Sequence, residues 1–255
     1  MKQGGELPWW IASIGVALGI VLLWQVAADR GWVSPIFLPG PDRALAALRE
    51  GFAAGGDLTL HVTTTIEHML YGWVLASVIG IALGALIGSS RRTRDYLGPT
   101  LEFIRPLPAS AIAPVAIAFL GLSQPMVLAV IAFGSVWPTL LATAHGVASV
   151  EPRLIEVARA LRLSRLQVMF KIALPNAVPD ILAALRYGLT VALILAVVGE
   201  MLAGQEGLGH RIILAARSFR SPDLFAGVIL LGLIGFTSNA LLAVAERRLL
   251  RWQGR

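Results

Sequence analysis

The sequence MLYGWVLASVIGIALGALIGS, residues Met69–Ser89, contains no Asp, Glu, Lys or Arg from end to end. An α-helix rises 1.5 Å per residue, so about 20 apolar residues cross the roughly 30 Å hydrocarbon core of a bilayer. Trp9–Ala28 has a similar length and also lacks these charged residues. In lipid, backbone polar groups must bond within their own element, as they do in a helix. Both stretches are therefore predicted to be transmembrane helices.

Four more transmembrane helices are predicted farther along the chain. Residues 106–150 again lack Asp, Glu, Lys and Arg, and this run is long enough for two helices. The turn between them is expected at Gly121–Pro125, because glycine and proline interrupt helices. A fifth helix is predicted at about Val178–Ala203 and a sixth at about Leu224–Ala245. The expected fold class is an all-α membrane protein with six transmembrane helices.

The composition agrees with a membrane protein and excludes several other classes. Of the 255 residues, 56% are hydrophobic and only 14% are charged, whereas soluble domains carry roughly 25% charged residues. Cysteine is absent, which excludes disulfides, thiolate metal sites and a cysteine nucleophile. Neither the His-Glu-x-x-His motif of metalloproteases nor the Gly-x4-Gly-Lys-Ser/Thr motif of P-loop ATPases occurs. No catalytic residue and no cofactor in this chain are therefore predicted, and ATP hydrolysis would require another subunit.

The positions of the basic residues predict the orientation in the membrane. Lys and Arg are enriched in the cytoplasmic loops of membrane proteins. Most of the Lys and Arg residues lie in cytoplasmic segments if the chain begins inside, including Arg91 and Arg92 after the second helix and Arg247 and Arg248 after the sixth. Both termini are therefore expected in the cytoplasm. Because the basic residues are spread over separate segments instead of forming one patch, nucleic-acid binding is not predicted.

Residues 1–60 are expected to form an N-terminal transmembrane helix and an outer loop. A cleaved signal peptide is the alternative, because Val26-Ala27-Ala28 is similar to a cleavage site. The apolar run is longer than the roughly 7–15 residues of signal peptides, which favours a retained helix. In the outer loop, Pro41 can start a helix with Leu45 and Leu48 along one face. That helix is expected to lie on the membrane surface.

The segment between the fourth and fifth predicted helices, Glu151–Pro175, is too long and too patterned for a simple connection. Pro152 suits the first turn of a short helix, and Ser164 can cap the N-terminus of a second one that ends at Leu174-Pro175. The first helix has an apolar face made by Leu154, Val157, Ala158 and Leu161. Such a face either packs against a partner protein or rests on lipid as an interfacial amphipathic helix. The residues alone favour neither interpretation.

The spacing within this segment resembles a known motif. Glu156-Val157-Ala158, three residues, Arg162, nine residues and Ile172-Ala173-Leu174-Pro175 are similar to the EAA loop of type I ABC importer permeases, the inner-membrane components of binding-protein-dependent transport. In that family the loop forms a coupling helix that lies in a cleft of the cytoplasmic ATPase. The resemblance assigns ATPase coupling to Glu156, Ala158, Arg162, Ile172, Leu174 and Pro175. The family usually has glycine at position 162, which permits a left-handed turn, so a differently shaped turn is expected here.

Further short motifs are similar to one branch of this family, the permeases for sulfonates, taurine, nitrate and bicarbonate. They are Phe37–Pro41, Ser90–Arg92, Arg105–Pro108, and Glu200–Leu202 followed by Gly207–Gly209. The likeness covers nearly the whole chain and implies an ABC importer transmembrane domain at residues 61–250, with the coupling loop at 151–175. His68 stands where the branch often has arginine, and Phe119-Leu120-Gly121 is less aromatic than usual. These departures leave open which anion is carried.

The same resemblance implies the partners and the location. The chain is expected to be a multi-pass protein of the bacterial inner membrane and to pair with a second copy of itself around the translocation path. Two ATPase subunits would bind ATP and magnesium, one on each coupling loop. A periplasmic or lipid-anchored solute-binding protein would deliver a small organic or inorganic anion. Membrane lipid covers the remaining surface.

Ionisable residues inside the predicted spans are the candidates for the translocation pathway, because such groups are costly in lipid. Arg186 and Glu200 lie on the fifth predicted helix, and His145 lies on the fourth. Arg186 can instead reach the headgroups or pair with a carboxylate on a neighbouring helix. His145 can instead complete a hydrogen bond between helices.

Two other classes of function make different predictions. An ion-coupled secondary transporter would bind its substrate on broken helices related by an internal repeat, and no such repeat is visible in the sequence. A membrane-embedded enzyme would need clustered His, Asp or Glu residues near one face. The four histidines of this chain are scattered along its length. An importer permease is therefore the preferred hypothesis.

Overall fold

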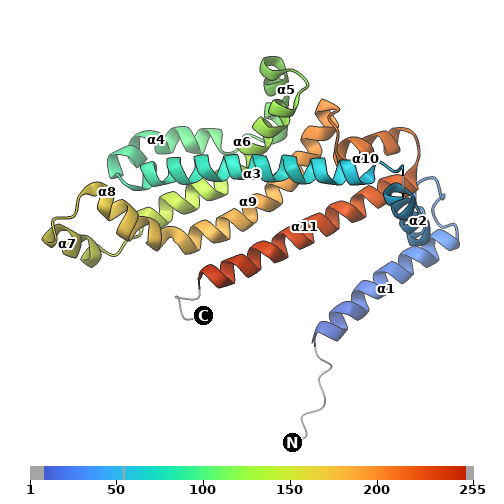
Figure 1. Ribbon diagram of the computed structural model, residues 1–255, viewed down its shortest axis with the longest axis horizontal. Coiled ribbons are helices and arrows are strands. Elements are labelled where there is room, and N and C mark those ends of the chain that lie inside the picture. The colour runs from blue at the N-terminus through green and yellow to red at the C-terminus, as the bar shows by residue number, and fades with distance from the viewer. Residues whose placement is uncertain (1–8, 54, 251–255) are drawn as a thin grey trace, which may run out of the picture.

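The computed structural model describes residues 9–53 and 55–250, and these are nearly all helical (Figure 1). The elements in chain order are α1 (Trp9–Asp29), α2 (Pro41–Phe52), α3 (Leu58–Gly88), α4 (Arg91–Ile104), α5 (Ala109–Leu120), α6 (Gln124–Ala148), α7 (Pro152–Ala160), α8 (Arg165–Val168), a π-helical segment (Met169–Ala173), α9 (Leu174–Ala203), α10 (Leu208–Arg217) and α11 (Ser221–Leu249). Figure 1 shows α7 and α8 at one end of the bundle, here called the α7 end, and α2 and α10 at the opposite end, the α10 end. The all-α fold class is confirmed.

Among the described residues, five helices are long and apolar enough to cross a membrane: α1, α3, α6, the continuous run Arg165–Ala203, and α11. The sixth exists only if α4 and α5 are counted as one span bent by 91°. The two helices predicted within residues 106–150 are confirmed as α5 and α6, with the turn between them at residues 121–123, but the first of the two is not a separate straight span. Pro106 and Pro108 lie in the break between α4 and α5, where their missing N–H groups interrupt helical hydrogen bonding. With 12 residues, α5 is about 18 Å long and is too short to span alone.

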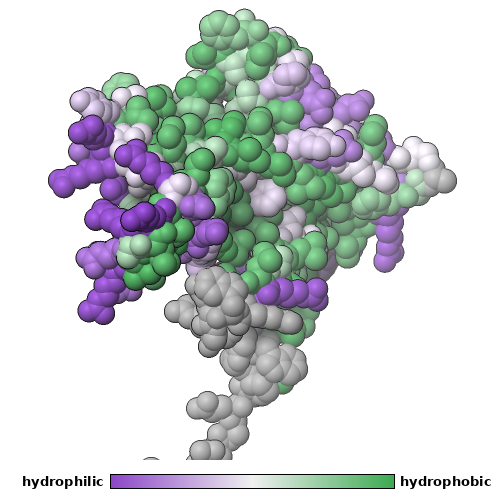
Figure 2. All heavy atoms as spheres, turned by 60° about the vertical axis from the view of Figure 1, so that its left-hand side comes forward, coloured by the Kyte–Doolittle hydropathy of each residue, from purple (hydrophilic) through white to green (hydrophobic). Residues whose placement is uncertain are grey.

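The core of the bundle lies where α3, α6 and α9 pack together. Its buried side chains are apolar and include Met69 on α3, Val130 and Ile131 on α6, and Ala192 and Ala196 on α9. Outside this core the surface is largely apolar. Figure 2 shows a broad hydrophobic surface between outlying groups of hydrophilic residues, as expected for a protein covered by lipid.

Small residues allow α3 to approach α6 closely. A Cβ atom added at Gly84 would lie 2.5 Å from the carbonyl oxygen of Leu140 and 2.7 Å from Cβ of Thr143. Gly80 and Gly88, four residues before and after, also face α6 at short range. Close approach of helix backbones through small residues is a common packing mode in membranes.

Gly84→Ala is therefore expected to destabilise the protein by about 1–3 kcal/mol, because the added methyl group separates two packed helices. The matched control is Gly19→Ala on α1, where no atom lies within 4 Å of the added Cβ. Alanine favours a helix over glycine by about 1 kcal/mol, so the control should be neutral or stabilising. Thermal unfolding of the purified protein in detergent measures both. Equal midpoints for the two variants would contradict this packing.

The N-terminal helices join the bundle at the α10 end. The apolar window of α1 is not buried by the rest of the chain, and Trp24 near its end donates a hydrogen bond from Nε1 to the carbonyl oxygen of Pro39 at 2.9 Å. The predicted helix at Pro41 is confirmed as α2, but it packs against α11 as well as facing outward. Leu48 is partly buried against the core while Leu45 is 50% exposed. The two leucines, three residues apart, share one side of α2 as expected, but only Leu48 reaches the core.

Candidate functional site

The predicted coupling segment lies at the α7 end of the bundle, beyond the ends of the membrane helices (Figure 1). It begins with α7, and Pro152 occupies the first turn of that helix as predicted. On its apolar face Ala158 is buried, whereas Leu154, Val157 and Leu161 are exposed. Most of this face is therefore uncovered by residues 9–53 and 55–250. Glu156 is also exposed.

Arg162 forms the turn between α7 and α8. Its φ is 54°, in the left-handed region that favours glycine. Arg162 N–H donates to the carbonyl oxygen of Arg159 at 2.9 Å, and Leu163 N–H donates to that of Ala158 at 2.9 Å. These two bonds form a Schellman motif, which closes a helix C-terminus and stabilises a left-handed residue there. The expectation of a differently shaped turn was therefore wrong, because the glycine-like backbone is kept with arginine in place.

Two substitutions at position 162 are expected to behave differently. A left-handed backbone costs an L-residue about 1–2 kcal/mol, while glycine avoids that cost but loses about 0.5–1 kcal/mol more in conformational entropy on folding. Arg162→Gly should therefore keep or slightly raise the thermal unfolding midpoint. Arg162→Val should lower it, because a β-branched residue fits this region poorly. An equal loss of stability in both variants would contradict the assignment of a left-handed turn.

The second half of the segment begins with a complete capping box. Ser164 Oγ accepts the N–H of Gln167 at 3.3 Å, and Gln167 Oε1 accepts the N–H of Ser164 at 2.8 Å. The predicted N-cap is confirmed. The role of Gln167 was missed, although serine followed three residues later by glutamine is a recognisable signal in the sequence.

The predicted end of this second helix at Leu174-Pro175 was wrong. From α8 the helix continues through the π-helical segment into α9 without a break, so that Arg165–Ala203 is one run of 39 residues. Within it Leu174 N–H donates to the carbonyl oxygen of Met169, five residues earlier. This wider spacing accommodates Pro175, which has no N–H to donate. The coupling segment is therefore joined directly to a membrane-spanning helix about 58 Å long.

The base of α9 is tied to the end of α6. Asn176 Nδ2 donates to the carbonyl oxygen of Gly146 at 2.9 Å, and Ala173, Ala177 and Ile181 form a buried cluster with Val147. Leu174 is partly buried against this cluster, Ile172 is half-buried and Pro175 is exposed. Of the predicted coupling residues, Ala158 and Leu174 thus support the fold of the segment, while Glu156, Arg162 and Pro175 are exposed.

At the other end of the same helix, Glu200 is fully buried. Its Oε2 accepts hydrogen bonds from Thr65 Oγ1 at 3.0 Å and from Gly209 N–H at 2.9 Å. Its Oε1 lies 3.0 Å from Nδ1 of His68. Thr65 Oγ1 also accepts the N–H of Leu208 at 2.8 Å. The carboxylate therefore joins α9 to α3 and to the start of α10.

The loop before α10 fits closely around this carboxylate. A Cβ atom at Gly207 would overlap the carboxyl group of Glu200, and the φ of Gly207 is 150°. Gly207 N–H donates to Nδ1 of His61 at 3.1 Å. The motif Glu200–Leu202 with Gly207–Gly209 thus marks one folded unit. The participation of His61, Thr65 and His68 was missed, because nothing in the local sequence pairs them with Glu200.

Ion pairs continue from this unit to the surface of the α10 end. Arg211 bonds to Asp57 and lies 3.4 Å from Asp223. The pKa of Asp57 is below its usual value: partial burial raises it, but the charge of Arg211, a hydrogen bond from its own backbone and nearby His61 outweigh that effect. The contribution of this carboxylate to stability is therefore present above its ordinary pKa, and is lost as the pH falls through the lowered value.

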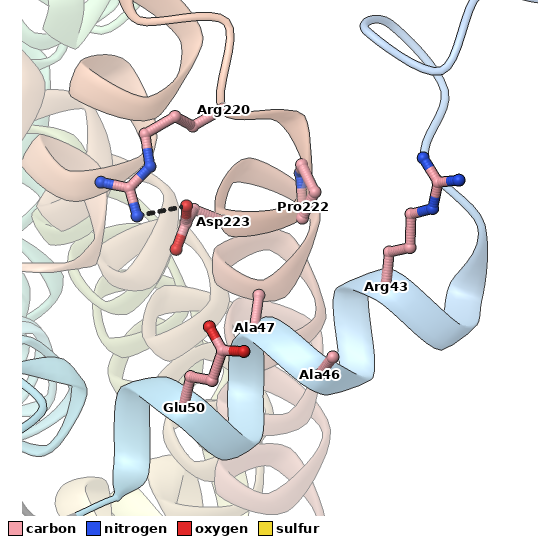
Figure 3. A pocket seen from close by; sticks show the side chains of 7 residues that line it. All are labelled: Arg43, Ala46, Ala47, Glu50, Arg220, Pro222 and Asp223. Atoms are coloured by element: carbon pink, nitrogen blue, oxygen red, sulfur yellow. Dashed lines mark ion pairs between the residues drawn. The ribbon is translucent and has the colours of Figure 1, made fainter.

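A pocket of about 380 Å³ opens beside these ion pairs, between α2 and the start of α11 (Figure 3). Arg220 Nη2 lies 2.8 Å from Asp223 Oδ2 there. Figure 3 shows Glu50 near this pair, while Arg43 extends from the far end of α2. The two arginines of the pocket therefore do not point toward one another, and each half of the lining carries its own charges. This pocket is a mixed-charge surface feature and not an anion site.

The three candidate pathway residues are not brought together. Glu200 is enclosed within the subunit, and its separation from Arg186 along α9 is about 21 Å. Arg186 is exposed, and no carboxylate in the described part of the chain pairs with it. His145 is exposed on α6, and the expected hydrogen bond between helices is not formed by its side chain among the described residues. Within the same ranges, no group of His, Asp and Glu is placed to hold a metal ion.

Comparison with known proteins identifies the family. Residues 76–251 match the family model of the binding-protein-dependent transport system inner membrane component. The chain belongs to this family. The resemblance stated for the segment Glu156–Pro175 is thereby confirmed at the level of the family.

Similar proteins of this family include permeases of the predicted sulfonate and nitrate branch. The chain is 31% identical over 252 residues to the putative aliphatic sulfonates transport permease protein of Bacillus subtilis, covering 99% of this chain and 91% of that protein. It is 32% identical over 240 residues to the nitrate import permease protein of Synechocystis, covering 91% and 86%. A methionine ABC transporter (MetNI) in an inward-facing conformation has the same fold, with a TM-score of 0.64, 18% identity, and coverage of 76% and 94%. This chain is accordingly a multi-pass transport permease.

Proposed function

We propose that this chain is the permease subunit of an ATP-driven importer in a bacterial inner membrane, with the α7 end in the cytoplasm and the α10 end outside. The distribution of Lys and Arg supports this orientation. Both termini are then cytoplasmic. ATP and magnesium are bound by a separate ATPase, since the chain contains no P-loop motif.

One observation carries the coupling mechanism: α7, a helix with an exposed apolar face, leads through a closed turn into a single helix long enough to cross the membrane. An ATPase that grips α7 moves the base of α9, because α8 and α9 are continuous. The Glu200 contacts at the far end of α9 pass this motion to α10 and α3. Binding and hydrolysis of ATP then favour two different states of the pathway, as any such switch requires different contacts in each state.

The assembly that follows from this mechanism contains two copies of the chain, with the pathway between them and one ATPase on each coupling segment. Two-fold pairing is the usual closed arrangement of identical subunits. A periplasmic or lipid-anchored solute-binding protein delivers the cargo to the mixed-charge surface of the α10 end. The cargo is a small anion of the aliphatic sulfonate, taurine or nitrate kind, as the relatives' names suggest, or bicarbonate, which the resemblance of the short motifs implies. Arg186 and His145, both exposed and cationic when protonated, are the candidate contacts along the path.

Purification from the native membrane in a mild detergent tests this function. An ATPase subunit should co-purify with the chain, and uptake of taurine or nitrate into proteoliposomes holding the whole complex should require ATP on the α7 side. Uptake that continues without ATP and stops when an ion gradient collapses would instead indicate a secondary transporter. Product formation by the isolated chain would indicate an enzyme.

A further inference from the structure

A second cavity, of about 370 Å³, lies between α4 and α6 toward the α7 end. It is separate from the coupling segment and from the Glu200 unit, but it shares His145 with the candidate contacts of the pathway. One part of its lining is apolar and includes Ile87, Leu101 and Leu140. The other part carries two guanidinium groups from α4, those of Arg94 and Arg105, and the imidazole of His145.

The polar groups of this cavity lack partners of opposite charge. No ion pair is formed by Arg94 or Arg105 within the ranges that the structure describes. Trp137 also lines the cavity, and its indole Nε1 is buried without a hydrogen-bond acceptor in the same ranges. A buried donor without an acceptor costs about 1–3 kcal/mol. Glu102 contributes one negative charge, so the two guanidiniums leave the cavity with a net positive charge.

We propose that this cavity binds the phosphate group of an anionic phospholipid from the cytoplasmic leaflet. Guanidinium groups bind phosphate through paired, charge-assisted hydrogen bonds, and basic pockets between membrane helices on the cytoplasmic side suit acidic headgroups. The apolar part of the lining then contacts the first part of an acyl chain. A small hydrophilic anion would have no apolar group to contact this apolar lining. The leaflet rests on the orientation proposed above, but the binding itself does not depend on transport.

The exposed residues of α4 support access of a lipid to this site. Figure 1 shows α4 running beside α3, and α5 turns away from it at 91°. Tyr96 and Phe103 on α4 are 81% and 79% exposed, as aromatic residues at a membrane interface commonly are. Basic and aromatic side chains are therefore exposed together on α4, a combination that is common near membrane headgroups.

Binding of phosphatidylglycerol to the purified full-length protein in detergent, followed by native mass spectrometry, tests the proposal. The double variant Arg94→Ala with Arg105→Ala should weaken the first binding event about tenfold or more. The matched control, Arg91→Ala with Arg92→Ala, removes two exposed arginines of the same helix that do not line the cavity, and should change it less than about threefold. Trp137→Phe, which keeps an aromatic ring and removes the N–H, should weaken binding about threefold.

Each alternative occupant gives a different result. Equal losses in the two double variants, or equally tight binding of phosphatidylcholine with the same acyl chains, would overturn the proposal in favour of nonspecific attraction. Displacement of the lipid by methyl phosphate or taurine at comparable concentration would overturn it in favour of a site for small anions. Disulfide cross-links between two copies of a Gly98→Cys variant in native membranes would show that a second subunit covers the cavity. None of these results bears on whether the chain is an ATP-driven permease.

Discussion

Glu156→Lys is expected to reduce ATP-driven uptake by about 30-fold or more while the protein still inserts and folds. Glu156 is exposed on α7 and forms no ion pair within residues 9–53 and 55–250, so its replacement removes nothing from the subunit's own fold. In the proposed cleft of the ATPase, a reversed charge at a contact residue costs about 2 kcal/mol or more, which corresponds to that factor. Uptake and ATP hydrolysis by the reconstituted complex measure the effect.

The control for this variant is Glu151→Lys, which makes the same charge change at the residue preceding α7. Glu151 is exposed and lies only 4.0 Å from Arg153, and exposed pairs of this kind contribute about 0–1 kcal/mol. We expect its uptake to stay within about threefold of the unmodified protein, since it lies outside the Glu156–Pro175 motif. Normal uptake by the Glu156 variant would count strongly against coupling through α7.

Glu200→Ala is expected to cause the largest loss of stability. The substitution leaves three buried polar groups without their partner: the donors Thr65 Oγ1 and Gly209 N–H, and Nδ1 of His68. Each buried unsatisfied group costs about 1–3 kcal/mol, so the loss should be at least about 3 kcal/mol. For a chain of this size the unfolding midpoint should fall by roughly 6–12 °C. Thermal unfolding in detergent measures the shift.

Glu206→Ala is the matched control for this effect, because Glu206 is an exposed carboxylate in the same loop. Exposed substitutions usually change stability by less than about 0.5 kcal/mol. Glu200→Gln should fall between the two, since the amide keeps the shape and one oxygen acceptor. If Glu200→Ala were as stable as Glu206→Ala, the carboxylate would not hold α10 against α3, and the transfer of motion along α9 would lose its far contact.

The membrane helices were largely predictable because their signal is local. A run without charged residues marks a helix whatever surrounds it, as for Met69–Ser89, which lies in α3 up to Gly88, and Leu224–Ala245 within α11. The bend between α4 and α5 was not predictable in this way. Pro106 and Pro108 indicate an interruption, but the angle between the two helices depends on how each packs against α6.

The coupling segment was predictable where its signals are local, and not where its structure depends on other parts of the chain. Helix caps at Pro152 and Ser164 depend on neighbouring residues and were expected correctly. The passage of the helix through Pro175 was not, because a π-helical segment can absorb a missing N–H without any sign in the composition. Glu200 shows the limit clearly: its partner Thr65 is 135 positions away, and only the packing of α3 against α9 brings them together.

Site-directed cross-linking from α7 is the sharpest test of ATPase coupling through this segment. The chain contains no cysteine, so a single Val157→Cys variant carries one reactive thiol on the exposed face of α7. In native membranes, a short cross-linker at position 157 should join the chain to an ATPase subunit, and a membrane-impermeant maleimide added to intact cells should not label it. Arg217→Cys at the α10 end should show the opposite pattern. Labelling of position 157 from outside the cell, or its failure to cross-link to any ATPase, would contradict the proposed mechanism.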